Sequence, residues 1–243
     1  MKNRTNIGSW LYCAAVAILI LAVSGTVNAQ NIITVDDNVP VKYDAESFRN
    51  SIGGGSGVVD VNHLVALKVC EIPSGDGWVG TAFWLTDRLL LTCDHNIQNM
   101  KTSHVISIHT VEGHTYKSVS VVSRNNDRDL ALLSVNDLNI KDHSVVNVSS
   151  GSDVVGTLRY QGFNPRVDGL VQLTGSLGET KLGSNTTGEP WFCTGTGTVI
   201  QGMSGGPVVD SSGQVVGVVT GVTKHFSVFT ELKSTQDFLD SVR

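Results

Sequence analysis

The feature that most constrains the fold is a series of short apolar runs separated by turn residues. Runs of about 4–8 residues are the length of strands and are too short for helices that span a core. The expected strands are Val65–Val69, Trp78–Trp84, Arg88–Thr92, Val105–Val111, Thr115–Val122, Leu130–Val135, Val154–Tyr160, Leu170–Ser176, Gly206–Val209 and Val215–Thr220. The dipeptide Glu112-Gly113 predicts a hairpin between two of these runs.

Glycine and the C-terminal segment complete this pattern. The chain has 26 glycines and only 5 prolines, which suits many tight turns because glycine reaches positive φ without steric cost. Helical periodicity is sustained only in Ser234–Val242, where Phe238, Leu239 and Val242 share one face and Ser234 is the expected N-cap. The sequence therefore predicts an all-β barrel or sandwich with a short C-terminal helix.

Length and charge narrow the class of protein. A chain of 243 residues can form one large domain or two smaller ones that share an interface. With 40% hydrophobic and 16% charged residues, it has a globular composition. The net charge of −5 and the absence of a basic stripe argue against a nucleic-acid partner.

The N-terminus has the pattern of a secretory signal peptide. Lys2 and Arg4 precede the uncharged stretch 7–27, and the small residues of Val27-Asn28-Ala29 predict cleavage after Ala29. The mature protein would then be secreted or periplasmic, with no stable membrane association. An uncleaved membrane anchor formed by residues 7–27 is the alternative. Residues 30–51 are expected to be a linker or a propeptide.

Three cysteines, Cys70, Cys93 and Cys193, remain after this segment. An odd number permits at most one internal disulfide and leaves one thiol over. Because no CxxC pair occurs, a zinc site is not expected. The three histidines His104, His109 and His114 also lack the spacing of a common metal motif, and we expect them on solvent-facing edges. Neither a metal nor a cofactor is expected.

Three separated segments bring together the residue types needed for nucleophilic catalysis. They are Leu90-Leu-Thr-Cys-Asp-His95, Asp127-Arg-Asp-Leu-Ala-Leu-Leu133 and Gly202-Met-Ser-Gly-Gly-Pro207. A serine hydroxyl needs a nearby base, an imidazole has a suitable pKa, and a carboxylate can orient that imidazole. Gly202 allows the backbone to turn so that its N–H and that of Ser204 point at one oxyanion. Asp129 is preferred to Asp127 because the apolar strand starts directly after it, and the side chain of Asp94 is expected to point away from His95.

These segments resemble those of the chymotrypsin-fold serine peptidases, in particular the bacterial HtrA-like and glutamyl endopeptidase-like groups. The resemblance covers roughly residues 52–243. It implies two antiparallel six-stranded β-barrels, at 52–145 and 146–243, with the active site in the cleft between them. It further implies that Ser204 is the nucleophile, His95 the general base and acid, and Asp129 the residue that orients His95, with Gly202 and Ser204 forming the oxyanion hole. The substrate would be a protein or peptide.

The resemblance also suggests a specificity pocket and shows one departure. Thr198 would lie near the base of the pocket, with Val222 and Ser227 as wall residues. None of these is charged, which argues against a preference for Arg or Lys. His225 could meet an acidic side chain, or be an ordinary loop histidine. Met203 replaces the aspartate that receives the new N-terminus in animal digestive relatives, so activation through Ile52 is not expected.

Two other functions fit parts of this sequence. An α/β-hydrolase would also fit Gly202-Met-Ser-Gly-Gly206, but it needs the order Ser, Asp, His and alternating helices, which this chain lacks. A catalytically silent chymotrypsin-like module that binds partners or acts as a chaperone is the non-enzymatic alternative. The complete set of three residues favours the peptidase.

Overall fold

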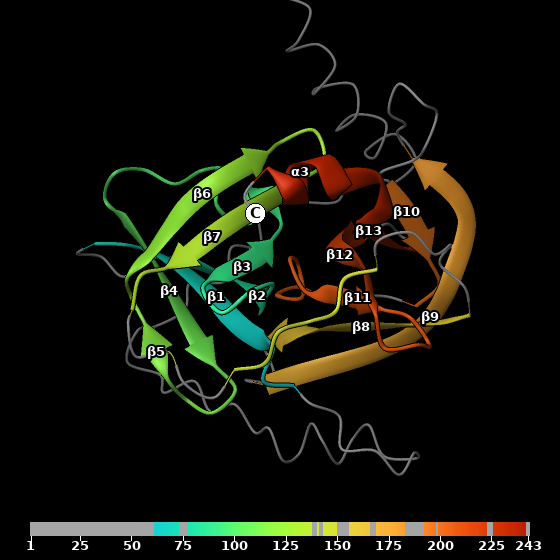
Figure 1. The fold of residues 1–243 in the computed structure, drawn as a ribbon, viewed down its shortest axis with the longest axis horizontal. Coiled ribbons are helices and arrows are strands. Elements are labelled where there is room, and N and C mark those ends of the chain that lie inside the picture. Colours follow the sequence, from blue (N-terminus) through green and yellow to red (C-terminus); the bar gives the residue numbers. More distant parts are fainter. Residues whose placement is uncertain are drawn as a thin grey trace, which may run out of the picture. The chain divides into compact units, whose positions relative to one another are not determined.

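The structure is a computed structural model, and it describes residues 61–72, 77–137, 140, 143–149, 156–165, 169–182, 192–197, 199–222 and 226–241. The expected signal peptide, the linker or propeptide and Ile52 therefore lie outside the described residues. The described part consists of two antiparallel β-sheets and a short C-terminal helix (Figure 1). None of its helices has the length and apolar character needed to cross a bilayer.

The first sheet contains seven strands, and two of the expected catalytic residues lie beside the ends of its strands β3 (Leu89–Thr92) and β7 (Leu130–Val135). Its order is β5 (Thr115–Tyr116), β4 (His104–Thr110), β1 (Leu64–Glu71), β2 (Gly77–Trp84), β3, β7 and β6 (Val119–Asn125). The sheet curls, so that β4 and β6 approach each other. The expected hairpin at Glu112-Gly113 is present, since Gly113 donates to the carbonyl of Thr110 and β4 pairs with β5.

The second sheet closes into a six-stranded barrel. Its order is β10 (Phe192–Gly195), β13 (Ser227–Glu231), β12 (Val215–Val222), β11 (Pro207–Val209), β8 (Thr157–Asn164) and β9 (Gly169–Leu182), and β9 pairs back with β10. The segment between β10 and β11 contains Ser204. Since both ends of this segment are held in the barrel, the position of Ser204 is tied to a rigid scaffold.

Three apolar clusters hold these sheets together. One fills the first sheet, with Trp84, Leu67 and Leu133 fully buried, and another fills the closed barrel around Tyr160 and Phe229. The third cluster joins the two sheets and the C-terminal helix. It contains Phe83, Leu91, Leu132, Phe163, Val218, Phe238 and Leu239, among others. Burial of such side chains contributes about 1.5–3 kcal/mol each, so this third cluster fixes the two halves against each other.

The predicted all-β chymotrypsin-like class is confirmed, with differences in detail. The first sheet has seven strands instead of six, because the run expected at Thr115–Val122 divides into β5 and β6. Strands β10 and β13 were not among the expected runs. Each has a short sequence whose pairing partners lie elsewhere in the barrel, so the local pattern alone is weak.

The C-terminal helix differs from the expectation at its start. A 3₁₀ turn, η2 (Lys233–Thr235), precedes the helix α3 (Gln236–Asp240). Ser234 lies inside this turn and its hydroxyl donates to the carbonyl of Glu231, so the expected N-cap is wrong. Phe238 and Leu239 are buried as expected.

Candidate active site

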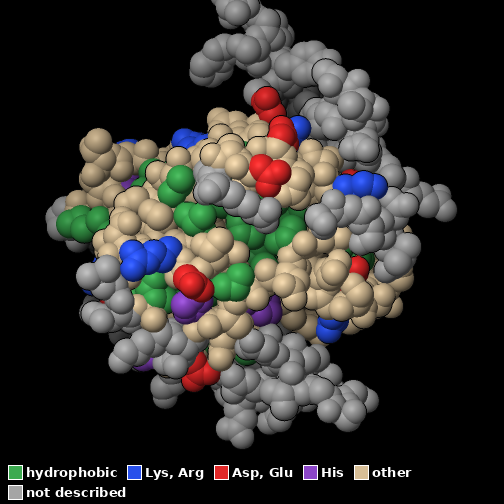
Figure 2. Space-filling model, in the orientation of Figure 1, with side chains coloured by type: hydrophobic (Ala, Val, Ile, Leu, Met, Phe, Trp, Pro, Cys, Tyr) green, Lys and Arg blue, Asp and Glu red, His purple; other side chains and the backbone are tan. Residues whose placement is uncertain are grey.

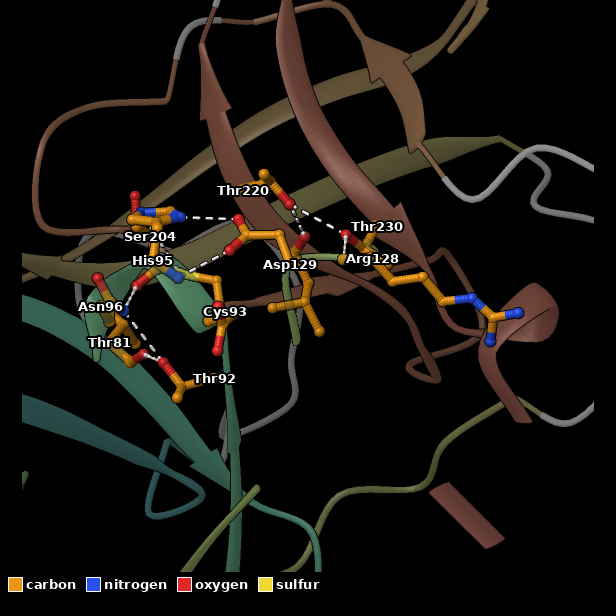
Figure 3. Close-up of polar contacts among 12 residues, drawn as sticks. Thr81, Thr92, Cys93, His95, Asn96, Arg128, Asp129, Ser204, Thr220 and Thr230 are labelled. Carbon is orange, nitrogen blue, oxygen red and sulfur yellow. Dashed lines mark hydrogen bonds and ion pairs between the residues drawn. The ribbon is translucent and has the colours of Figure 1, made fainter. Parts of the chain in front are cut away.

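His95 lies on a three-residue 3₁₀ turn, η1 (Asp94–Asn96), that begins two residues after β3 ends. Its side chain is 34% exposed, whereas Asp94 and Asn96 on either side are buried. The Asn96 amide donates to Thr92 Oγ1 at 3.0 Å and to the carbonyl of Ser204 at 2.9 Å. The turn is therefore attached both to its own strand and to the segment that contains Ser204 (Figure 3).

Asp129 contacts His95 through both carboxylate oxygens. Oδ1 accepts from the His95 backbone N–H at 2.8 Å, and Oδ2 is 2.7 Å from Nδ1. An ionised carboxylate can only accept, so Nδ1 carries the hydrogen and Nε2 is the nitrogen left to act as a base. Among the described residues, Asp129 is the only non-glycine with a positive φ, at 51°. Aspartate tolerates this conformation better than most residues. Asp127, the alternative carboxylate, is exposed in the same turn.

The second barrel supports the turn that carries Asp129. The Thr230 hydroxyl on β13 donates to the carbonyl of Arg128 at 2.7 Å, and the hydroxyl of Thr220 lies 3.1 Å from that of Thr230. The Arg128 guanidinium in turn forms an ion pair with Asp237 on α3. Strands far apart in the sequence thus fix the residue directly before Asp129 (Figure 3).

The electrostatics of the site favour a protonated imidazole. Burial acts to lower the pKa of His95, but Cys93 and Asp129 act against it, and the pKa is raised well above its ordinary value. We attribute the increase to Asp129, because burial raises the pKa of the Cys93 thiol and keeps that group uncharged. The charged imidazolium is therefore stabilised by the neighbouring carboxylate.

We expect an NMR titration of the His95 ring to show a midpoint well above the ordinary imidazole pKa of about 6.5. Asp129→Asn should lower this midpoint. A folded-state pKa above the unfolded one stabilises the protein fully below the unfolded value, and this contribution disappears as the pH rises through the folded value. The stability difference between the wild type and Asp129→Asn should therefore be larger near about pH 6 than at alkaline pH. An unshifted midpoint in the wild type would contradict this assignment.

The segment around Ser204 is a glycine-rich turn with two positive φ angles, +95° at Gly202 and +87° at Gly205. The N–H of Met203 donates to the carbonyl of Ile200, and that of Gly205 donates to the carbonyl of Val219. Within the described residues, the N–H groups of Gly202 and Ser204 donate no backbone hydrogen bond. These two N–H groups, separated by one residue in the same turn, could therefore both donate to one oxygen atom of a ligand.

Thr81 on β2 attaches this turn to the first sheet. Its hydroxyl, fully buried, donates to the carbonyl of Gly202 at 2.7 Å and accepts from the N–H of Phe163 at 3.0 Å. Its own N–H donates to the carbonyl of Ser204 at 2.8 Å. One residue therefore bonds to both ends of the tripeptide that contains the serine.

We expect Thr81→Val to remove the two buried hydrogen bonds of this hydroxyl, to the Gly202 carbonyl and to the Phe163 N–H. The loss of stability should be about 1–3 kcal/mol, measured by denaturant unfolding. Thr157→Val, at the exposed start of β8, is the matched control, with a change within about 0.5 kcal/mol. Equal stabilities of the two variants would show that the Thr81 contacts do not matter.

Cys93, His95 and Asp129 form the one group of candidate metal ligands among the described residues, with their ligand atoms within 4.8 Å of one another. The 2.7 Å between Nδ1 and Oδ2 is a hydrogen-bond distance and leaves no space for an ion between them. Cys93 Sγ is 3.5 Å from His95 Nε2. None of the three described cysteines, Cys70, Cys93 and Cys193, is in a disulfide.

The histidines expected on solvent-facing edges are only partly so. His114 is exposed, but His104 and His109 on β4 are half-buried. The ring of His104 packs against Trp78 at a centroid distance of 5.4 Å, and His109 Nδ1 lies 2.9 Å from the hydroxyl of Thr115.

On the face drawn in Figure 2, the Lys and Arg side chains of the described residues are scattered.

The residues expected around a specificity pocket are only partly described. Thr198 and His225 lie outside the described residues. Val222, at the end of β12, is 37% exposed. Ser227 is fully buried, donates to the carbonyl of Gly197 at 2.8 Å and accepts from the N–H of Val199 at 3.0 Å. Its hydroxyl therefore holds the segment that leads to Gly202.

Several residues that shape this site were not anticipated from the sequence. Thr81, Thr92, Asn96 and Thr230 act through hydrogen bonds to residues distant in the chain, and Thr81 and Gly202 are 121 positions apart. A threonine or asparagine in a strand or turn carries no local signal of such a bond. The pattern Thr92-Cys-Asp-His95 contained one of these residues, but only the folded arrangement indicates what it does.

Comparisons with known proteins agree with this fold. The family described as trypsin-like peptidase domain matches residues 80–218, more than half of the chain. The Rv3671c protease of M. tuberculosis, in its active form, is similar in structure with a TM-score of 0.59 and 20% identity, covering 74% of this chain and 80% of that one. The serine endoprotease of Yersinia pestis has a TM-score of 0.60 and 17% identity, covering 74% of this chain and 62% of the other. No curated protein sequence matches the chain.

The fold is that of the chymotrypsin-like peptidases. This chain belongs to the trypsin-like peptidase domain family. As a protease, it acts on protein or peptide substrates.

Proposed function

We propose that this protein is a serine endopeptidase that hydrolyses peptide bonds through Ser204, His95 and Asp129. The observation that carries the proposal is the double contact of Asp129 with the backbone N–H and the Nδ1 of His95, at 2.8 and 2.7 Å. This contact fixes the ring orientation and leaves Nε2 as the base. The proximity of Ser204 is supported by the hydrogen bond of its carbonyl to Asn96, the residue after His95.

The mechanism follows from these positions. Ser204 Oγ attacks the peptide carbonyl while His95 Nε2 takes its proton, and Asp129 stabilises the imidazolium. The negative oxygen of the tetrahedral intermediate accepts from the N–H groups of Gly202 and Ser204. His95 then gives the proton to the leaving amine, and an acyl-enzyme forms on Ser204. Water, deprotonated by His95, hydrolyses this ester and restores the serine.

The positively charged imidazolium is an intermediate of each half-reaction, so its stabilisation lowers the barrier. The raised pKa of His95 also means that the free enzyme is inactive at acid pH, where Nε2 is already protonated. Activity is therefore expected to rise with pH through the raised pKa of His95.

The specificity pocket is proposed to include Thr198, Val222 and His225, while the buried Ser227 holds the segment behind it. No acidic group occurs among them, which favours substrates other than those with Arg or Lys at the cleaved position. His225 would favour an acidic residue there. Cleavage of a peptide library is compared between the wild type and His225→Ala. A preference for an acidic residue that is lost in the variant would assign that preference to His225.

Export is part of the proposal. The charged start, the uncharged stretch and the small residues before position 30 support a signal peptide that is removed after Ala29. N-terminal sequencing of the protein recovered from cells should begin at Gln30. A retained N-terminus in the membrane fraction would favour an anchor at residues 7–27.

A fluorophosphonate probe tests the nucleophile directly. We expect the mature protein to be labelled, and Ser204→Ala and His95→Ala to abolish the labelling. A well-folded wild type that remains unlabelled would favour a binding or chaperone module instead. The same result after removal of residues 30–51 would exclude inhibition by a propeptide.

A further inference from the structure

The short turn that carries His95 has no side-chain cap of its own. It contains only the three residues Asp94–Asn96, and its N-cap residue, Cys93, makes no side-chain capping bond. A single 3₁₀ turn has little intrinsic stability. Its position therefore depends on contacts with the rest of the fold. Trp78 Nε1 donates to the carbonyl of Asn96 at 2.5 Å, the Asn96 amide provides a second attachment, and the Asp94 side chain makes a third.

Asp94 is a buried carboxylate in a two-point ion pair. Its side chain is only 3% exposed. Arg124 Nε donates to Oδ1 at 2.5 Å, and Arg124 Nη2 donates to Oδ2 at 3.0 Å. A guanidinium that meets both oxygens of a carboxylate restrains orientation as well as distance. A carboxylate this deeply buried is also costly to leave unpaired.

The partner in this pair belongs to the same hairpin as Asp129. Arg124 is on β6, opposite Ala131 on β7, and Asp129 is in the turn between these two strands. A bulge between Val121 and Ser123 shifts the register of β6 by one residue. Such a shift decides which side chains face each side of a strand. The hairpin therefore reaches η1 at two points: through Asp129 to His95 and through Arg124 to Asp94.

We propose that the Asp94–Arg124 ion pair is a positioning device that holds His95 in register with Asp129. Movement of η1 that breaks the contact between Nδ1 and Oδ2 would also have to break this ion pair, which would leave the buried Asp94 carboxylate without its guanidinium partner. Arg124 and Asp94 thus act through His95 and do not contact the reacting atoms. The catalytic role of this ion pair rests on the proposed function. Its effect on the contact between His95 and Asp129 does not depend on that function.

The test uses the mature protein with Arg124→Gln and Arg124→Lys. Two measurements are made on each: the downfield proton resonance of the His95 Nδ1–H···Asp129 hydrogen bond, and the kinetics of fluorophosphonate labelling and peptide cleavage. We expect Arg124→Gln to weaken or shift the resonance and to lower kcat about tenfold or more, with KM nearly unchanged. Arg124→Lys keeps the charge but loses the planar fork, so its effect should be intermediate. Because it leaves no unpaired buried charge, it decides the question if Arg124→Gln fails to fold.

The matched control is Ile106→Ala, in the core of the first sheet and outside these contacts. It should lower the thermal stability but leave the resonance and kcat unchanged. If the Arg124 variants also lose only stability, the pair is a structural ion pair and the proposal is wrong. The resonance separates the two proposals. A wild type that is not labelled, but whose resonance depends on Arg124, would refute the peptidase mechanism and retain the positioning role.

Discussion

Asp129→Asn should lower peptide cleavage and fluorophosphonate labelling by on the order of 10⁴-fold while the fold is retained. An amide can present its NH₂ group to the ring, in which case Nδ1 becomes the acceptor and the hydrogen moves to Nε2. Nε2 of His95 would then already carry a hydrogen and could not accept the proton of Ser204. The backbone N–H of His95 can still donate to the amide oxygen of the new asparagine, so the turn η1 should remain in place.

The control for this variant is Asp127→Asn, two residues earlier in the same turn. Asp127 is exposed, so its loss should leave labelling and cleavage unchanged. Rates are compared by single-turnover labelling at a pH above the raised pKa of His95, so that protonation does not contribute. Comparable losses in the two variants, or near-normal labelling of Asp129→Asn, would remove Asp129 from the mechanism.

Gly205→Ala should be among the most disruptive single substitutions in the described part of the chain. A Cβ at this position would lie 2.1 Å from the carbonyl oxygen of Thr81 and 2.2 Å from Thr92 Oγ1. The first of these atoms is backbone of β2, which cannot move without disturbing the sheet. We therefore expect a loss of stability well above the few kcal/mol of an ordinary core substitution, and no labelling of Ser204.

Gly213→Ala separates the steric clash from the backbone strain. Its φ of +85° is nearly the same as the +87° of Gly205, but nothing lies within 4 Å of a Cβ at Gly213. It should therefore show the cost of the backbone conformation alone, about 1–3 kcal/mol, with normal labelling. The stabilities are measured by denaturant unfolding. Similar losses in the two alanine variants would show that the close approach at Gly205 is relieved by small shifts.

The strands that could be predicted are those whose own residues carry the signal. Leu130–Val135 has the same bounds in the sequence pattern and in the structure, because it is an apolar run that pairs with a neighbouring strand on both sides, β3 and β6. The strand expected at Leu170–Ser176 extends to Leu182, beyond its apolar part. Its polar end is held by pairing with β10, and that pairing is not visible in the run itself.

Hydrogen bonds between distant residues account for the other differences. Ser234 has the residue type of an N-cap. A 3₁₀ turn nevertheless forms directly after β13, before the helix, and the hydroxyl of Ser234 donates to the carbonyl of Glu231. Ser227 was expected as a pocket wall. Its full burial and its bonds to Gly197 and Val199 come from the pairing of β13 with β10, which brings the two segments together.

The sequence by itself predicted the β class, most of the strands, and the order of the candidate catalytic residues His95, Asp129 and Ser204. These predictions follow from local patterns: short apolar runs, glycines in turns, and three short motifs. Only the tertiary structure decided how those residues are held. The hydroxyl of Thr81 reaches Gly202, Thr230 reaches Arg128, and Arg124 reaches Asp94, over separations of 121, 102 and 30 residues. No local propensity encodes such contacts, because they depend on which strands become neighbours when the apolar faces of the two sheets are buried against each other.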